Sequence, residues 1–467
     1  MAYDGNLPAP TFDLDTYANN YQGALLPIRL AHISTHCPSL SRHALSSAID
    51  AAKQGKDVQL YARLHDIADR LGFADLAKMD TAWASKQEEA NRRELSRLEG
   101  ELRGYKNNMI RESIRMGQDD LAAHQLSTGG PVPDPNDPHS QHTSGYNAAY
   151  QAYGKMRDYC TTPTHIASMT LRLIYTSLLQ AVSSRQAGGS PTMYYNTAVS
   201  NAHRIRTIGV KEEEMDRLVP IMNASLGIAY LGNGSYRDAA SYLLSTHQDY
   251  ATLGAVHNTD FPRMVASGND IAVYGGLCAL ATMDREQLLT RVLGGPFRFF
   301  LELEPHMRKA ISLYTTAKYE ACLNTLRHYH ADWSLDVFLG PHVDLLFARI
   351  REKSITAYFS SFSQVSLSSL ASTFPPAHTT SSDVQHAMEL EALSMIQSGT
   401  LAARLDVVNG LLVAPRTEAR AATHADAKAA ADEVERTLLL RLQRVNAVVA
   451  GLEVPRGKGG GAQQAGW

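Results

Sequence analysis

The spacing of apolar residues constrains the fold of this chain more than any other feature. Apolar residues recur at three- and four-residue steps along most of the sequence, as in Leu60, Leu64, Ile67 and Leu71. This period places one apolar stripe on each helix, whereas strand-like alternation is scarce before the last hundred residues. The sequence therefore predicts a mainly α-helical protein.

The first third of the chain divides into a helical region and a loop. Within the N-terminal helical region, residues 1–125, the segment Lys86–Arg115 carries opposite charges at helical spacing and predicts one long solvated helix. Residues 126–144 hold four prolines among Gly, Ser, Asp and His, and no helix can cross such a stretch. We interpret it as an exposed Pro-rich loop.

Helical hairpins follow the loop. In Ala224–Tyr250, Gly232 and Gly234 end one helix, Tyr236 packs at the turn, and two alanines permit close approach of the next helix. Stacked helical hairpins of this kind are typical of tetratricopeptide-like (TPR-like) repeats. We therefore predict TPR-like helical repeats over residues 145–268.

A different pattern begins near residue 363. The segment Ser366–Thr373 starts with a capping Ser and predicts a short helix, and Asp383–Ile396 predicts a second one. The apolar segments Leu401–Leu405 and Gly410–Ala414 flank a turn and predict two strands. Two helices and a two-stranded wing are the parts of a winged helix, which we assign to residues 363–415.

The chain closes with one more amphipathic helix, within residues 416–452. Six apolar residues on it step by three or four positions and form one stripe that must be buried against something. These candidate interface residues are Val434, Leu438, Leu442, Val445, Val449 and Leu452. The Gly-rich residues 453–467 predict a disordered tail.

The winged helix favours a protein partner over nucleic acid. Its second helix carries Asp383, Glu389 and Glu391 and no Lys or Arg, so it would repel phosphate. The edge of its wing could instead extend a sheet by strand addition. The candidate interface residues of the wing are Leu401, Arg404, Leu405, Leu411 and Val413.

Candidate metal and catalytic sites are few. His328 and His330 form an HxH pair, but Pro341 occupies the position where zinc isopeptidases of the MPN family have an aspartate. His32 and His36 share a helix face without the glutamate of a zinc protease motif. Zinc needs three or four convergent ligands, so we predict no metal, no cofactor and no catalytic residue.

Composition excludes further classes of protein. Lys plus Arg number 44 against 47 for Asp plus Glu, which indicates no polyanion partner. The four cysteines are far apart and predict buried free thiols, not a disulfide framework. No stretch approaches the roughly 20 predominantly apolar residues of a membrane span, and the start of the chain lacks a signal-peptide pattern. We expect an intracellular, soluble protein.

Residues 269–362 predict further apolar helices, and their sequence resembles the PCI region of the family of COP-nine signalosome subunit one. The matching blocks are YGGLCALATMDREQL (Tyr274–Leu288), FFLELEP (Phe299–Pro305), KYEACL (Lys318–Leu323), LDVFLGPHV (Leu335–Val343) and ITAYFSSF (Ile355–Phe362). Earlier similar blocks are FDLDTYANNYQG (Phe12–Gly23), IRMGQDDL (Ile114–Leu121) and MRDYCT (Met156–Thr161). The resemblance implies that residues 269–362 are the helical part of a PCI domain, completed by the winged helix.

The resemblance implies a non-catalytic scaffold in a complex that removes Nedd8 from cullins and so regulates cullin-RING ubiquitin ligases. The isopeptidase would be a separate MPN subunit. The partners would be other PCI and MPN subunits, and cullin-RING ligases through the complex, in the nucleus and cytoplasm. The winged helix would join an arc of PCI subunits, and the last helix would enter a shared helical bundle.

Other functions remain open at this point. The related proteasome-lid subunit, regulatory-particle non-ATPase seven, shares the architecture that the sequence predicts. A nucleic-acid-associated PCI protein of translation or mRNA export would share the PCI domain as well. A hydrolase has the least support, because nothing in the sequence brings Ser, His and Asp together.

Overall fold

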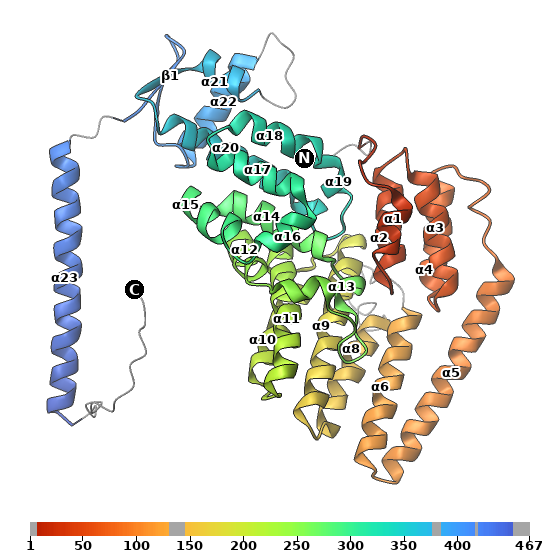
Figure 1. The fold of residues 1–467 in the computed structure, drawn as a ribbon. Coiled ribbons are helices and arrows are strands. Elements are labelled where there is room, and N and C mark those ends of the chain that lie inside the picture. The colour runs from red at the N-terminus through yellow and green to blue at the C-terminus, as the bar shows by residue number, and fades with distance from the viewer. Residues whose placement is uncertain (1–6, 130–144, 376–383, 416–418, 452–467) are drawn as a thin grey trace. The chain divides into compact units, whose positions relative to one another are not determined.

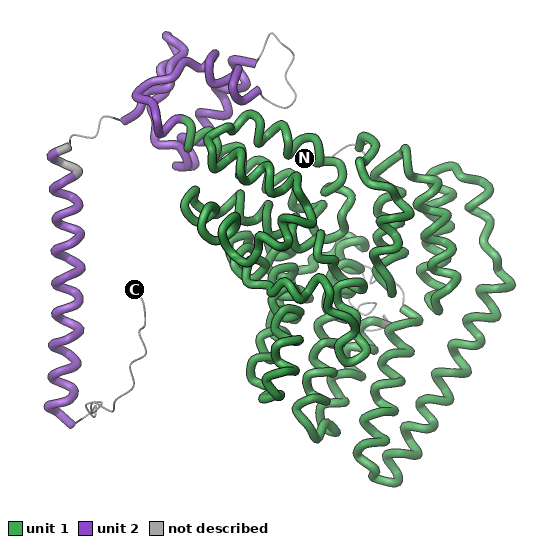
Figure 2. The backbone as a smooth tube through the Cα atoms, viewed as in Figure 1, with its two compact units in different colours: residues 1–358 green, residues 359–467 purple. Residues whose placement is uncertain are grey.

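The computed structural model describes residues 7–129, 145–375, 384–415 and 419–451. They belong to two compact units, residues 1–358 and 359–467 (Figure 2). Helices dominate both units, and the named strands of the described residues lie in one small sheet of the second unit. The prediction of a mainly helical protein is confirmed.

Six helices open the first unit, and neighbours such as α2 and α3 or α5 and α6 pack side by side (Figure 1). They are α1 (Leu14–Asn19), α2 (Leu25–His36), α3 (Ser41–Gln54), α4 (Val58–Arg70), α5 (Thr81–Asn107) and α6 (Arg111–Thr128). Three of them begin at an aspartate whose carboxylate accepts a backbone N–H bond of the first turn: Asp13, Asp57 and Asp80. Such caps satisfy N–H groups that have no partner within the helix.

The prediction of one helix over Lys86–Arg115 is wrong, because the chain reverses direction between α5 and α6. Met109 has a φ of 53°, in the left-handed region, and it separates the two helices. The reversal lets Leu98 and Leu102 of α5 pack with Ile114 and Leu121 of α6 in one apolar cluster. Burial of this cluster favours a hairpin over a single helix that would leave the same leucines in water.

The helical hairpins continue after residue 144. The elements are α8 (Gly145–Met156), η1 (Arg157–Tyr159), α9 (Pro163–Gln186), α10 (Thr192–Arg204), η2 (Ile205–Thr207), α11 (Glu212–Gly232) and α12 (Tyr236–Leu244). Each α-helix from α8 to α11 packs on the next one along the chain, and α8 also packs on α6. Residues 126–128 of the predicted Pro-rich loop belong to α6, and residues 130–144 lie outside the described residues.

The hairpin of α11 and α12 agrees with its prediction in detail. Gly234 has a φ of 77° just after α11, and Tyr236 is buried at the first position of α12. The two helices come so close that a Cβ at Gly227 would lie 2.4 Å from Cγ of Leu243. Small residues therefore set the distance between these helices.

Further helices complete the first unit. They are η3 (Gln248–Thr252), α13 (Phe261–Met264), α14 (Gly268–Thr282), α15 (Arg285–Gln287), the π-helical segment η4 (Leu288–Leu293), α16 (Arg298–Leu303), α17 (Pro305–Thr315), α18 (Tyr319–His328), α19 (His330–Ser334) and α20 (Gly340–Phe359). Ser267 caps the almost fully buried α14 with a reciprocal capping box to Asp270. The second unit begins at the last residue of α20.

The second unit contains two short helices and a small antiparallel sheet. The elements are β1 (Gln364–Ser366), α21 (Leu367–Thr373), α22 (Val384–Gln397), β2 (Arg404–Asp406) and β3 (Leu411–Val413). The predicted strands β2 and β3 pair antiparallel, and a third strand that was not predicted, β1, pairs with the other side of β3, so the order is β1-β3-β2. Ser366 is the last residue of β1 and caps the N-terminus of α21, as predicted.

The last helix, α23 (Ala419–Val449), also belongs to the second unit. Its described side chains are exposed or half-buried over the whole length of the helix. None of the helices in the described part of the chain is long and apolar enough to cross a membrane. The predicted disordered tail, residues 453–467, lies outside the described residues.

Candidate protein interface

The most exposed apolar surface of the described chain runs along α23. Five of the six predicted interface residues of this helix are exposed, and Val449 is the most exposed at 82%. They are Val434, Leu438, Leu442, Val445 and Val449. The sixth, Leu452, lies outside the described residues. An exposed apolar row on one helix face is typical of surfaces at which proteins bind one another.

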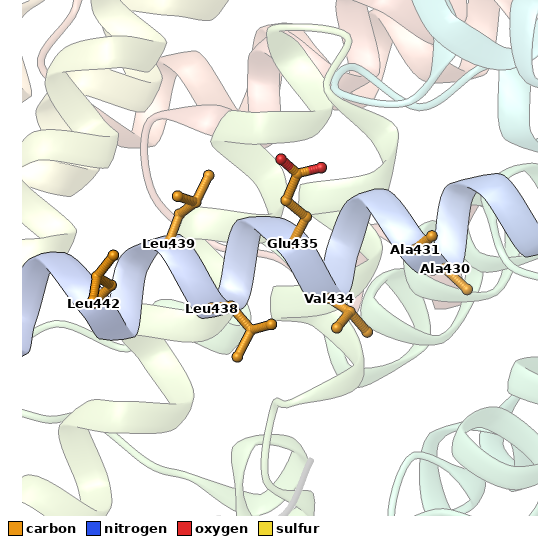
Figure 3. A pocket seen from close by; sticks show the side chains of 7 residues that line it. All are labelled: Ala430, Ala431, Val434, Glu435, Leu438, Leu439 and Leu442. Atoms are coloured by element: carbon orange, nitrogen blue, oxygen red, sulfur yellow. The ribbon is translucent and has the colours of Figure 1, made fainter.

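The apolar face is wider than the predicted stripe. Leu439 is 51% exposed and lines a shallow surface groove together with Val434, Leu438 and Leu442. Figure 3 shows Leu439 projecting on the same side of the helix as Glu435, away from Val434 and Leu438. At about 100° per residue, the positions from Val434 to Leu439 span an arc of roughly 140°. The prediction followed apolar residues only at steps of three and four from Val434, so it missed Leu439. A helical wheel of residues 434–449 places Leu439 beside the predicted stripe.

The wing residues divide between two faces of the sheet. Arg404 lies opposite Val413, and Asp406 lies opposite Leu411, so these four residues share the outer face. The other predicted residues belong to the inner side. Leu405 lies opposite the fully buried Leu412, and Leu401 is only 3% exposed.

The position of the strands decides where another strand could be added. The central strand β3 bonds to both neighbours, so the outer strands β1 and β2 are the edges of the described sheet. The strand β1 went unpredicted because it has only three residues, of which Val365 alone is buried.

The second helix of the winged helix, α22, presents apolar side chains outward. Leu390 is 54% exposed and Leu393 is 39% exposed, one turn apart on the helix. The described part of this helix contains no Lys or Arg. Its outer surface therefore suits a protein surface and not a phosphate backbone.

The polar centre of the first unit is a buried ion-pair network around Arg29, which is 0% exposed. Arg29 donates hydrogen bonds to Asp336 at 2.5 Å and to the carbonyl of Val265 at 2.6 Å. The hydroxyl of Tyr274 donates to the other oxygen of Asp336 at 2.7 Å. The hydroxyl of Tyr21 donates to both carboxylate oxygens of Asp270, which lies 4.0 Å from the Arg29 guanidinium.

This network joins segments that are distant in the sequence. Residues of Phe12–Gly23, Tyr274–Leu288 and Leu335–Val343 all contribute to it. Burial opposes the charge of Asp336, but Arg29 and the backbone N–H of Leu339 outweigh it and lower the pKa of that carboxyl. Each of the named groups is engaged by another part of the chain, so we assign the network a structural role.

The histidine pairs are also part of the packing. The His32 ring lies 4.1 Å from the His36 ring, and burial together with the nearby His36 lowers the pKa of His32 to about 4. His330 bonds to Asp344 at 2.9 Å, while His328 packs edge-on against Tyr329. No group of three or more metal-ligating side chains converges within the described residues.

The cysteines are free thiols in the described structure. Cys37, Cys278 and Cys322 are buried, and Cys160 is half-buried. Burial raises the pKa of both Cys278 and Cys322 to about 12. Thiols held protonated in this way are poor nucleophiles.

Two family models match the chain. The model of the 26S proteasome subunit RPN7 matches residues 80–130 and 141–291, and that of the PCI domain matches residues 326–416. The second match includes the winged helix and the helices α19 and α20 before it.

Curated relatives match nearly the whole chain. COP9 signalosome complex subunit 1 of Emericella nidulans is 40% identical over 452 residues, which are 96% of this chain and 84% of the relative. The same subunit of Arabidopsis thaliana is 32% identical, over 93% of this chain and 89% of the relative. That of Neurospora crassa is 31% identical, over 91% and 88% respectively.

Proposed function

The chain belongs to the family of COP9 signalosome complex subunit 1, and from this premise we propose that it is a non-catalytic scaffold of a complex that removes Nedd8 from cullins. In such a complex the isopeptidase is an MPN-type subunit, and this chain holds other PCI and MPN subunits in place. The complex regulates cullin-RING ubiquitin ligases, in the nucleus and the cytoplasm.

The observation that carries this proposal is the exposed apolar face of α23. A helix that leaves Leu438, Leu439 and Leu442 each more than half exposed is built to be covered by a partner. Burying one such leucine contributes about 1.5–3 kcal/mol, so the whole face stabilises an assembly substantially. We assign α23 to a helical bundle shared with other subunits.

The winged helix supplies a second contact in the proposed assembly. The outer face of its sheet carries Arg404, Leu411 and Val413, and the outer strand β2 is positioned to accept a strand from a neighbouring PCI subunit. Leu401 is excluded from this surface because its side chain is buried in its own unit. Leu405 contributes through its backbone on β2.

The alternatives have less support. A proteasome-lid subunit shares the RPN7 family model, but the relatives that span nearly the full length of the chain are signalosome subunits. A nucleic-acid-binding winged helix needs cations on the helix that enters the groove, and α22 has none among its described residues.

Removal of the last helix tests the proposal. The chain lacking Thr423–Trp467 is expected to stay folded in its first unit but to recover far less of the other signalosome subunits when it is purified from its native cells through an affinity tag. Circular dichroism of the truncated chain controls for folding. Normal co-purification of the other subunits by the folded, truncated chain would contradict the assignment of α23.

A further inference from the structure

One carboxylate lies inside the apolar face of α23. Glu435 lines the same shallow groove as Val434, Leu438 and Leu442 (Figure 3). On a helical wheel it falls between Leu442 and Leu439, roughly 40° from the latter. An interface that covers the whole face therefore covers Glu435 as well.

Glu435 has no cation within reach along its own helix. The positions three and four residues away are Ala431, Asp432, Leu438 and Leu439. The neighbouring acidic residue Glu433, by contrast, has Arg436 three residues further along. Charged side chains on a helix pair mainly at these spacings, so the missing partner of Glu435 is not supplied locally.

A carboxylate that is buried in an apolar interface without a counter-charge is strongly unfavourable. We infer that the helix covering this face of α23 carries a Lys or Arg side chain opposite Glu435, and that this ion pair sets the register of the assembled bundle. A single polar pair inside an apolar seam is a well-attested way to fix helix register. The inference rests on the proposed function, because it needs a partner helix on α23.

The width of the face adds a second property of the partner. A seam between two helices needs only a narrow apolar stripe, whereas this face spans an arc of roughly 140°. Val434 and Leu439 at its two edges are each more than half exposed. The bundle therefore places at least two helices against α23, one on either side of the line through Leu438 and Leu442, and the cation belongs to the helix on the Leu439 side.

Substitutions in the full-length chain test the inference by quantitative mass spectrometry of the signalosome subunits that co-purify with it. Glu435→Lys is expected to reduce their recovery by about tenfold or more, because it places two cations together in an apolar interface. Glu435→Leu is expected to reduce recovery as well, because it leaves the partner's cation buried and unpaired.

The matched control is Glu433→Lys, which makes the same charge change on the same helix but outside the apolar face. The Glu433→Lys chain is expected to recover as much of the other signalosome subunits as the unmodified chain does. Restoration of the Glu435→Lys complex by an acidic substitution of one Lys or Arg on a partner helix would identify the cation.

Leu438→Asp separates failure of the inference from failure of the proposed function. If Leu438→Asp loses the other subunits while Glu435→Leu and Glu435→Lys both keep them, α23 is the interface but Glu435 has no cationic partner. If Leu438→Asp also keeps them, the apolar face is not the interface, and both the inference and the assignment of α23 are overturned.

Discussion

At the scale of single residues, the guanidinium of Arg29 is a fully buried charge. It bonds to Asp336, 307 residues away in the sequence, and to the backbone of Val265. Burial opposes its charge, but the surrounding tyrosines and Asp336 raise the pKa of Arg29 well above its ordinary value. Removal of one member of such a pair leaves the other charge buried without compensation.

We predict that Arg29→Met lowers the free energy of unfolding of the first unit by about 3–5 kcal/mol, because Asp336 stays buried. Urea denaturation followed by the fluorescence of Trp83 and Trp333 measures the change. The control is Arg42→Met: Arg42 pairs with Asp75 at the surface, where both side chains are more than half exposed. A surface pair contributes less than about 1 kcal/mol, so similar losses in the two variants would contradict a special role of Arg29.

Asp57 makes a pH-dependent contribution to stability. Burial raises the pKa of Asp57 to about 6, although its carboxylate accepts the backbone N–H of Leu60. The unfolded chain therefore loses this proton at lower pH than the folded chain, and stability falls as the pH rises from about 4 to about 6. With about 1.4 kcal/mol per pKa unit, the loss is at most about 3 kcal/mol.

We predict that Asp57→Asn, which keeps a capping oxygen but has no charge, gains stability relative to the unmodified chain as the pH rises. Melting temperatures of both chains at pH 4 and pH 7.5 measure the difference. The melting temperature of the Asn variant relative to that of the unmodified chain is expected to be higher at pH 7.5 than at pH 4. A difference that is independent of pH would show that Asp57 titrates normally in the folded protein.

The sequence predicts residue roles well where they depend on near neighbours. Ser366 caps α21, and Gly234 takes up the left-handed backbone that ends a helix, both as expected from local patterns. The Arg29 network could not be predicted, because its members come together only through tertiary folding and no local spacing indicates it. Glu435 could have been found with a helical wheel, since its surroundings are one helix.

At the scale of elements, close approach of the helices in the hairpin of α11 and α12 depends on glycine. We predict that Gly227→Ala lowers the free energy of unfolding by about 1–3 kcal/mol, because the added methyl would overlap Leu243. Gly100 on α5 is the matched control, since nothing lies within 4 Å of a Cβ there. Gly100→Ala is expected to stabilise the chain by about 0.5–1 kcal/mol, as alanine favours helices. Chemical denaturation of both variants measures whether the free energy of unfolding falls for Gly227→Ala and rises for Gly100→Ala.

Element boundaries show where periodicity is insufficient. The spacing of charges in Lys86–Arg115 is helical on both sides of Met109, so it gives no sign that the chain turns there. The packing of Leu98 and Leu102 against α6 favours the turn, and it forms only in the folded chain. The short strand β1 likewise depends on its pairing with β3 and has no pattern long enough to predict a strand.

At the scale of the whole molecule, the two units differ in how they bury their apolar residues. In the first unit, helices such as α9, α11 and α14 bury most of their residues against other parts of the unit. The second unit ends in a helix whose leucines are exposed. This contrast supports a chain that supplies its own core but presents one helix to other subunits.

Membership of a deneddylating assembly is tested most directly by purification of the tagged full-length chain from its native cells. The purified material is analysed by mass spectrometry and assayed for cleavage of a Nedd8–cullin conjugate. We predict an MPN isopeptidase together with other PCI subunits, and removal of Nedd8 by the eluate. Proteasome, ribosome or export-factor partners without this cleavage would contradict the proposed function.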